Sequence, residues 1–302
     1  MKTPVAESKP TLTTYPNEHL CLVAYTDPDV SRVPWEFGLR VMRTLAPLVV
    51  KGDLLVVEPP IGPVPPNGRY KPVKMPLEEY IKLMEHYAAD VTTTQWFHAR
   101  NRNSQFPGSF FTLYGHDGAN NLGAMGCIKL SVATGLLKKL TQRDLLRILH
   151  ELFAELHTWG HCRQIFCDVG LGKAIREGDI YGTMYSAFTD DFYRCVEYCA
   201  WERLTRDERL TSLRGVYPIT YVSTKFIAAD KIAKFVSYFN KTAKNGGLGK
   251  GAVVYEDGSA TFWCVKSPLE LADAVNPEPK GPSGALAARL RKWLHDEGLL
   301  KY

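Results

Sequence analysis

The sequence predicts an α+β fold in which antiparallel strands carry helices packed on one face. Three observations in the stretch 109–170 support this. Two apolar segments with strand-like alternation flank a turn rich in Gly and Asn. A long amphipathic helical pattern follows them, and another apolar segment follows the helix. Because a helix that crosses back over antiparallel strands buries its own apolar face and theirs, this stretch is the predicted core.

The central helix is expected over residues 141–159, between strands at 124–132 and 162–170. Thr141 is a suitable N-cap and Asp144 lies in the first turn, while Gly160 is placed to end the helix. Apolar side chains recur at spacings of three and four, which predicts one buried helix face. Its members are Leu145, Ile148, Leu149, Leu152, Phe153 and Leu156.

N-terminal to this core, residues 1–18 are expected to form a flexible leader. Residues 59–76 contain seven prolines, which favours extended, polyproline-like chain that acts as a stiff connector or as a recognition arm. The remaining patterns predict strands at 19–25, 54–58, 90–100 and 109–114, and helices at 35–49 and 77–89.

C-terminal to the core, residues 170–182 are Gly-rich and are expected to be irregular. Helices are predicted at 189–204, 229–239, 268–274 and 284–297, and strands at 213–222, 252–255 and 260–265, with an Asp-Gly hairpin turn at 256–259. Similar strand and helix groupings occur around 95–170 and 213–297. They predict two similar-looking ferredoxin-like lobes, at 19–170 and 171–302, or one continuous domain.

Composition excludes several functional classes. A chain of 302 residues can bury a large core without a disulfide or metal. The formal net charge of +5 is spread along the sequence, so no nucleic-acid partner is predicted. No apolar run reaches the roughly 18 residues of a membrane helix, so no membrane association is expected. Seven cysteines and no secretory signal predict reduced thiols in the cytoplasm.

One cluster of residues could hold a metal ion. His150, His157, His161 and Cys162 surround the end of the central helix. Three imidazoles can bind zinc with an open position, but this spacing matches no standard zinc signature, and helix-end histidines more often bind carbonyl groups. No Gly-x-Ser-x-Gly elbow and no group of nucleophile, base and orienting residue is recognisable. The sequence therefore predicts a binding protein with no catalytic residue and no cofactor.

Two short segments carry a resemblance to a known family. Gly160-His161 follows the central helix, and Arg214-Gly215-Val216-Tyr217 opens the last third of the chain. In this order the chain resembles the type VI immunity family of bacterial toxin-immunity proteins. It departs from the family pattern at Cys162-Arg163, where small residues would be expected, and lacks a Gly-Asp element near the C-terminus.

The resemblance implies an immunity protein that binds a cognate secreted toxin and occludes it. Such a protein needs aromatic or arginine anchors on its surface. The candidates outside the apolar faces are Tyr70, Trp96, Tyr181 and Tyr185. A homodimer is also compatible with the sequence. Two alternatives stay open: a metal- or thiol-dependent enzyme with a site near 150–167, and a structural or adaptor component of a phage or secretion particle.

Overall fold

The computed structural model describes a sheet, its covering helices and the turns that join them. The described residues are 18–27, 55–57, 73–76, 95–101, 108–116, 127–133, 140–171, 203–247, 251–264 and 281–301, with the single residues 40, 43, 78, 79 and 82.

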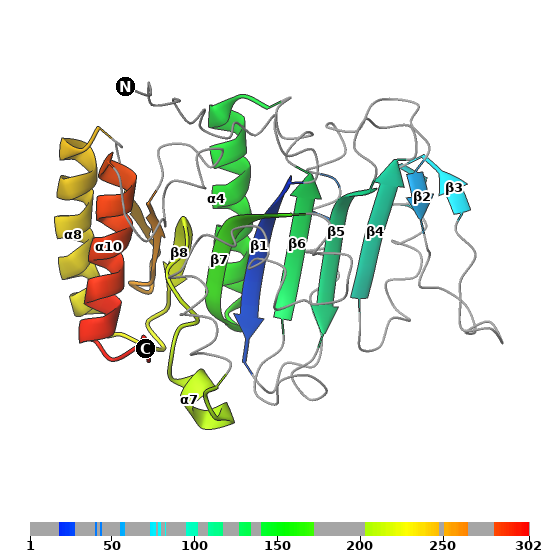
Figure 1. Cartoon of the computed structure of the whole chain (residues 1–302). Coiled ribbons are helices and arrows are strands. Elements are labelled where there is room, and N and C mark those ends of the chain that lie inside the picture. The colour runs from blue at the N-terminus through cyan, green and yellow to red at the C-terminus, as the bar shows by residue number, and fades with distance from the viewer. Residues whose placement is uncertain are drawn as a thin grey trace, which may run out of the picture.

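Ten strands of the described chain form one sheet, in the order β3-β2-β4-β5-β6-β1-β7-β8-β10-β9 (Figure 1). Each pairing within it is antiparallel, which confirms the predicted α+β class with antiparallel strands. The strands are β1 (Glu18–Thr26), β2 (Leu55–Val57), β3 (Val73–Met75), β4 (Gln95–Asn101), β5 (Gly108–His116), β6 (Cys127–Ala133), β7 (Cys162–Leu171), β8 (Ile219–Val222), β9 (Ala252–Val254) and β10 (Ala260–Trp263).

Strand β1 lies in the interior of the sheet although it comes first in the sequence. It pairs with β6 on one side and with β7 on the other (Figure 1). Leu22 of β1 lies opposite Leu130 of β6 and Cys167 of β7, and all three side chains are buried. Because side chains alternate along a strand, this register places these three side chains together on one face of the sheet.

Helix α4 (Gln142–Trp159) covers that face, as the sequence predicts. Thr141 accepts a hydrogen bond from the backbone N–H of Asp144, and Gly160 ends the helix with a φ of 78°. A positive φ is inexpensive for glycine, which explains why the helix stops there. The six apolar residues predicted to face inward are buried: Leu145, Ile148, Leu149, Leu152, Phe153 and Leu156.

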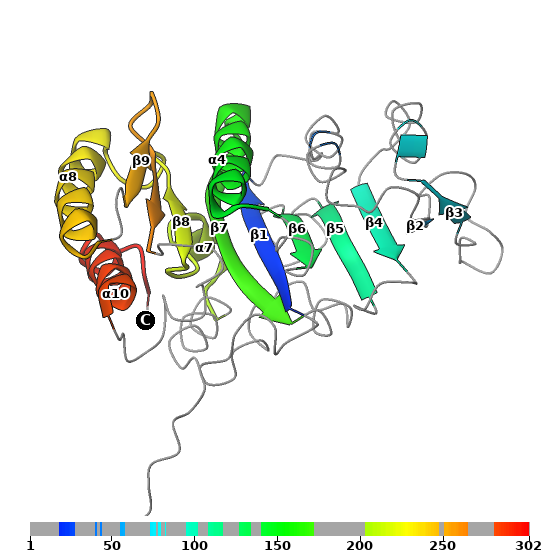
Figure 2. The same cartoon turned by 90° about the horizontal axis from the view of Figure 1, so that it is seen from above.

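Helices α8 (Ala229–Asn245) and α10 (Gly281–Asp296) lie on the opposite face of the sheet from α4. The ring of Trp263 in β10 contacts His150 and Phe153 of α4 at 4.2 and 6.4 Å between centroids. The next side chain along the strand, Phe262, contacts Phe235 of α8 at 5.6 Å. Figure 2 shows β8 and β9 between α4 and α8. The prediction that all helices pack on one face is therefore wrong for this end of the sheet, because β10 is apolar on both faces.

The strand predicted at 213–222 is shorter than expected. Only residues 219–222 form β8, and residues 213–218 are buried as irregular chain. The backbone N–H of Leu213 donates to the carbonyl of Leu299, and that of Arg214 donates to the side chain of Gln164. These two N–H groups are therefore hydrogen-bonded although the segment does not pair with a neighbouring strand. The short helix α7 (Arg206–Leu210) precedes this segment and begins with a capping box that the sequence analysis did not identify.

The sheet continues across the predicted boundary between the two lobes. Strand β7 pairs with β8, with Phe166 opposite Thr220 and Cys167 opposite Ile219. The ferredoxin-like detail is not confirmed by the order of the ten strands. The division at 170/171 stays a prediction.

Several predicted elements lie wholly or mainly outside the described residues. Of the predicted helices at 35–49 and 77–89, the structure describes only single helical residues. The prediction of polyproline-like chain through residue 76 is wrong for Val73–Met75, which forms a strand paired with β2. None of the helices in the described part of the chain combines the length and apolar character needed to span a bilayer. Five predicted segments lie outside the described residues. They are the leader 1–18 apart from Glu18, the prolines at 59–72, the Gly-rich stretch beyond residue 171, the helix at 189–204 apart from its last two residues, and the helix at 268–274.

A close approach of α8 to the start of β9 gives a first prediction. A β-carbon at residue 251 would lie 2.7 Å from that of Ala243 and 2.9 Å from the ring of Phe239. Gly251→Ala is therefore expected to lower the free energy of unfolding by about 1–3 kcal/mol through overpacking. Urea denaturation of the parent and of Gly251→Ala measures this difference in the free energy of unfolding. Adding Ala243→Gly removes one of the two contacts, so the double variant should lose less than the sum of the single losses. A Gly251→Ala protein as stable as the parent would contradict the close approach.

Candidate functional site

The four candidate metal ligands in α4 and in the turn and strand that follow it do not converge. His150 lies against the ring of Trp263, whereas His157 is hydrogen-bonded to the hydroxyl of Tyr221. Seven residues along a helix correspond to about 10 Å, too far for two imidazoles to bind one ion. His161 lies beyond the turn at Gly160, and its ring packs edge-on against Trp159. Cys162 is buried in β7. Within the described residues, no group of three or more His, Cys, Asp or Glu side chains could hold a metal ion.

His157 joins α4 to the β9–β10 hairpin. Its Nδ1 lies 2.8 Å from the hydroxyl of Tyr221, its ring stacks on Tyr255 at 4.2 Å, and its Nε2 lies 3.5 Å from the Asp257 carboxylate. Burial raises the pKa of Asp257, but hydrogen bonds from Ser259 and Thr224 and the charge of His157 outweigh it, so the pKa is lowered overall. The aspartate is therefore held ionised beside the histidine. These contacts fix the hairpin against the end of the helix.

Tyr221 gives a prediction at alkaline pH. Burial raises the pKa of its phenol from 10.0 to about 12. Because the pKa of Tyr221 is raised in the folded state, the contribution of the neutral phenol to stability is complete below pH 10.0. That contribution is lost as the pH rises towards 12. A shift of two pKa units corresponds to about 3 kcal/mol in the free energy of unfolding. Thermal unfolding at pH 8 to 12 should therefore show a steeper alkaline loss in the parent than in Tyr221→Phe. Parallel curves for the two proteins would contradict the buried phenol.

A second polar cluster lies where β1 ends. The carboxylate of Asp27 lies 2.7 Å from Nε of Arg163 and 2.6 Å from Nζ of Lys225, and the aspartate side chain is 16% exposed. Lys225 also donates to the carbonyl of Gly160, and Arg163 to that of Leu210. The Nδ1 of His161 also lies 4.0 Å from the carboxylate. Because both cations also bind main-chain carbonyls, this cluster links β1, β7 and the loop after β8.

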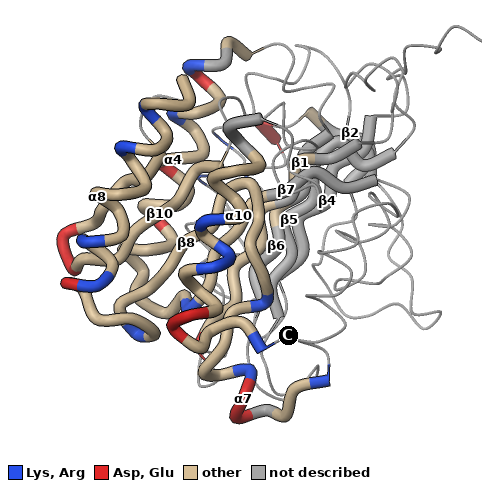
Figure 3. Tube along the Cα trace, turned by 60° about the vertical axis from the view of Figure 1, so that its left-hand side comes forward, with Lys and Arg blue, Asp and Glu red and all other residues tan. Residues whose placement is uncertain are grey.

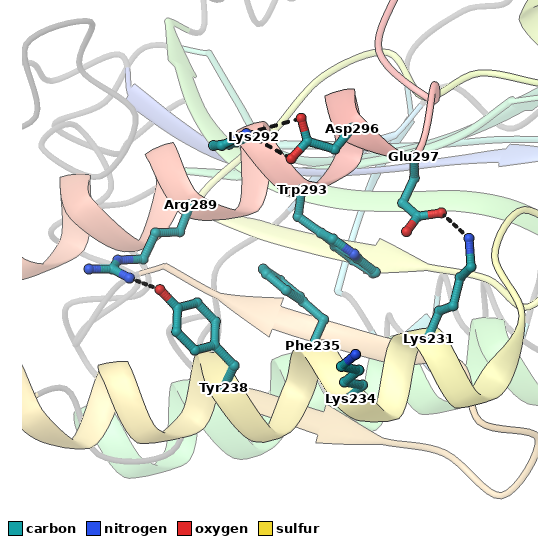
Figure 4. Close-up of a pocket in the computed structure, with 9 residues that line it drawn as sticks. All are labelled: Lys231, Lys234, Phe235, Tyr238, Arg289, Lys292, Trp293, Asp296 and Glu297. Carbon is teal, nitrogen blue, oxygen red and sulfur yellow. Dashed lines mark hydrogen bonds and ion pairs between the residues drawn. The ribbon is translucent and has the colours of Figure 1, made fainter.

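On the other side of the sheet, α8 and α10 border an open groove of about 640 Å³ (Figure 4). Phe235 of α8 and Trp293 of α10 stack with parallel rings, 4.0 Å apart and 9° from coplanar. Beneath them lies the fully buried Phe262 of β10. Tyr238, one helical turn beyond Phe235, is 49% exposed and is among the most exposed large hydrophobic side chains of the described chain. The groove therefore has an apolar floor with an accessible aromatic residue at one end.

Charged side chains surround this floor. The groove is lined by four cationic and two anionic side chains. Both carboxylates are paired within the groove, Glu297 with Lys231 and Asp296 with Lys292, each at 2.8 Å. Arg289 donates a hydrogen bond to the hydroxyl of Tyr238, and its guanidinium carbon lies 5.5 Å from the centre of that ring. Figures 3 and 4 show that the cations come from both helices. We name this surface the α8–α10 groove.

Comparison with solved structures finds a similar fold. A structure described as "Pseudomonas aeruginosa T6SS protein PA0821" matches 92% of this chain and 73% of its own, with a TM-score of 0.52 and 13% sequence identity. That likeness shows the fold alone. No protein-family model matches the chain, and the comparison with curated proteins finds no match. The resemblance to the type VI immunity family therefore stays a prediction.

The surface anchors predicted from the sequence are other residues. Tyr70, Tyr181 and Tyr185 lie outside the described residues. Trp96 lies in β4 opposite Tyr114 of β5. Apolar spacing in the predicted helices at 229–239 and 284–297 places Phe235 and Trp293 on inward faces and does not single out Tyr238. A signal for the groove was present, because Lys231, Lys234, Tyr238 and Lys241 follow one helical stripe beside the apolar face.

Proposed function

We propose that this protein is a type VI secretion immunity protein that binds a cognate antibacterial toxin in the cytoplasm and occludes it. Two observations point to this system. The fold is shared with a Pseudomonas aeruginosa protein named for type VI secretion. In addition, Gly160-His161 and the segment 214–217 resemble motifs of the immunity family. Occlusion requires a complementary surface and no chemistry of its own.

The α8–α10 groove is the observation that carries the proposal. Interface hot spots are enriched in Tyr, Trp and Arg placed over well-packed apolar pockets. Tyr238 and Arg289 contact each other at one end of the groove, and Trp293 stacks on Phe235 in its centre. The floor is continuous with the core through Phe262, so a bound partner would meet a rigid surface. Rigid aromatic anchors cost little conformational entropy on binding.

Co-expression with the product of the adjacent gene tests the proposal. We expect the two proteins to co-purify as a one-to-one complex by size-exclusion chromatography. Cells that express the adjacent product as a toxin should survive only when this protein is also present. Survival of cells that express that product alone would overturn the proposal, as would purification of this protein only as a large homo-oligomer without that product.

A further inference from the structure

We propose that the α8–α10 groove binds an acidic amphipathic helix of the partner, with the partner's carboxylates over the Tyr238 end. This inference rests on the proposed function, because it names the segment of the toxin that the groove recognises. It is carried by three features of the groove: the distribution of charge along it, the shape of its apolar floor, and its position between two helices.

Charge is distributed unevenly along the groove. The carboxylates of Asp296 and Glu297 lie towards the end that Lys231 borders, and both are neutralised there by lysines (Figure 4). Among the described residues, neither Lys234 nor Arg289 pairs with a carboxylate. The uncompensated positive charges are therefore those of Lys234, beside Phe235 in the middle of the groove, and of Arg289 at the Tyr238 end (Figure 4). Opposite charges across an interface fix its register and speed association, so carboxylates of a partner should lie at this end.

The cationic surface continues beyond the groove along α8. Lys241 and Lys244 follow Tyr238, and both are exposed. Lys241 is on the same helical stripe as Lys234 and Tyr238, because the three are separated by four and three residues. An anionic segment that starts over Arg289 would therefore meet further positive charge as it extends along α8.

The floor of the groove is suited to an apolar side chain. The edges of the stacked Phe235 and Trp293 rings border it, and the exposed ring of Tyr238 extends it. The occupant thus needs apolar residues on one side and acidic residues beside them.

The position between two helices favours a helical protein segment. Strand addition requires a free sheet edge, but this surface is made by the sides of α8 and α10. Amphipathic helices bind apolar grooves through anchors spaced three or four residues apart. Nucleic acid is disfavoured because Asp296 and Glu297 would face its phosphates, and two of the four cations are already paired with them.

A peptide-binding assay tests the recognition chemistry by itself. The probe is a fluorescein-labelled helical peptide of about 14 residues with Leu on one face and Glu beside it. The comparison probe replaces each Glu with Lys, and a short DNA duplex represents nucleic acid. Fluorescence anisotropy should show binding of the Glu peptide that weakens with added salt, and neither other probe should bind as tightly. No binding of the Glu peptide, or tighter binding of either other probe, would overturn the inference.

Charge reversal locates the binding site. We expect the double variant Lys234→Glu/Arg289→Glu to bind the Glu peptide about tenfold or more weakly. The matched control is the double variant Arg143→Glu/Arg147→Glu, which reverses two exposed charges on α4, on the opposite face of the sheet, and should bind as the parent does. Circular dichroism verifies that all three proteins are folded. Equal peptide affinity in the double variant and the parent would place the binding elsewhere and contradict the inference.

The same variants separate this inference from the proposed function. If the parent protects cells from the toxin and the double variant does not, both stand. If the double variant still co-purifies with the toxin and protects as well as the parent, the immunity function stands and the groove inference fails. If the parent neither binds the toxin nor protects, the proposed function fails, and the peptide assay alone decides whether the groove binds acidic helices.

Discussion

Replacing Phe262 with alanine is expected to lower the free energy of unfolding by about 3–5 kcal/mol, among the largest effects of a single substitution in this chain. Phe262 is fully buried. Its ring contacts Phe235 and Phe239 of α8 and Trp293 of α10 at 5.2–5.8 Å between centroids. Alanine would leave a cavity where both helices pack on β10, and close-packed neighbours relax only partly into such a space.

Urea denaturation of Phe262→Ala and Phe262→Leu measures this effect. Leucine keeps most of the apolar volume, so its loss should be smaller, about 1–1.5 kcal/mol. The exposed Tyr238 on the same helix layer provides a matched control, because Tyr238→Ala removes an aromatic ring that is half in solvent. Equal losses for Phe262→Ala and Tyr238→Ala would contradict the packing described for α8, α10 and β10.

Replacing Arg214 with methionine is expected to destabilise the protein by about 2–4 kcal/mol. The side chain of Arg214 is 1% exposed. Its Nη1 donates to the hydroxyl of Tyr25 at 2.8 Å, and its guanidinium carbon lies 5.7 Å from the ring centre of Phe166. Methionine retains the alkyl length but removes the charge and the donors, which leaves buried polar partners unsatisfied.

Two further variants separate the contributions to this loss. Tyr25→Phe removes one hydrogen bond to a charged group and should cost about 1.5–3 kcal/mol. Arg214→Lys retains a positive charge but lacks the planar guanidinium, so it should not restore full stability. Chemical denaturation of the three proteins gives the comparison. An Arg214→Met protein as stable as the parent would mean that the buried guanidinium adds nothing to the fold.

The buried position of Arg214 also explains the motif that carries the family resemblance. Arg214, Val216 and Tyr217 are all buried, and the ring of Tyr217 stacks on Phe166 at 3.9 Å. The other motif, Gly160-His161, is the end of α4 and the turn that follows. Neither segment lies in the α8–α10 groove. In this chain both are needed to build the scaffold, so they indicate a fold more directly than a binding partner.

The candidate site could not be predicted from the apolar periodicity of α8 or of α10 alone. Phe235 and Trp293 recur at apolar positions, so their spacing predicts burial. They are only partly buried, because α8 and α10 meet there at the edge of their contact with β10. Tyr238 and Arg289 are 51 residues apart, and no local pattern relates them. Their contact exists only because the two helices pack side by side.

The sequence by itself determined the local features of this protein: the apolar face, cap and end of α4, the hairpin turn at 256–259, and the antiparallel α+β class. Periodicity states which side of a helix or strand is buried, and capping residues state where it ends. The tertiary structure alone decided that β1 lies between β6 and β7, that α8 and α10 cover the face opposite α4, and that a cationic aromatic groove forms between them. Those features depend on contacts between residues far apart in the chain, and local periodicity does not specify which buried surfaces meet.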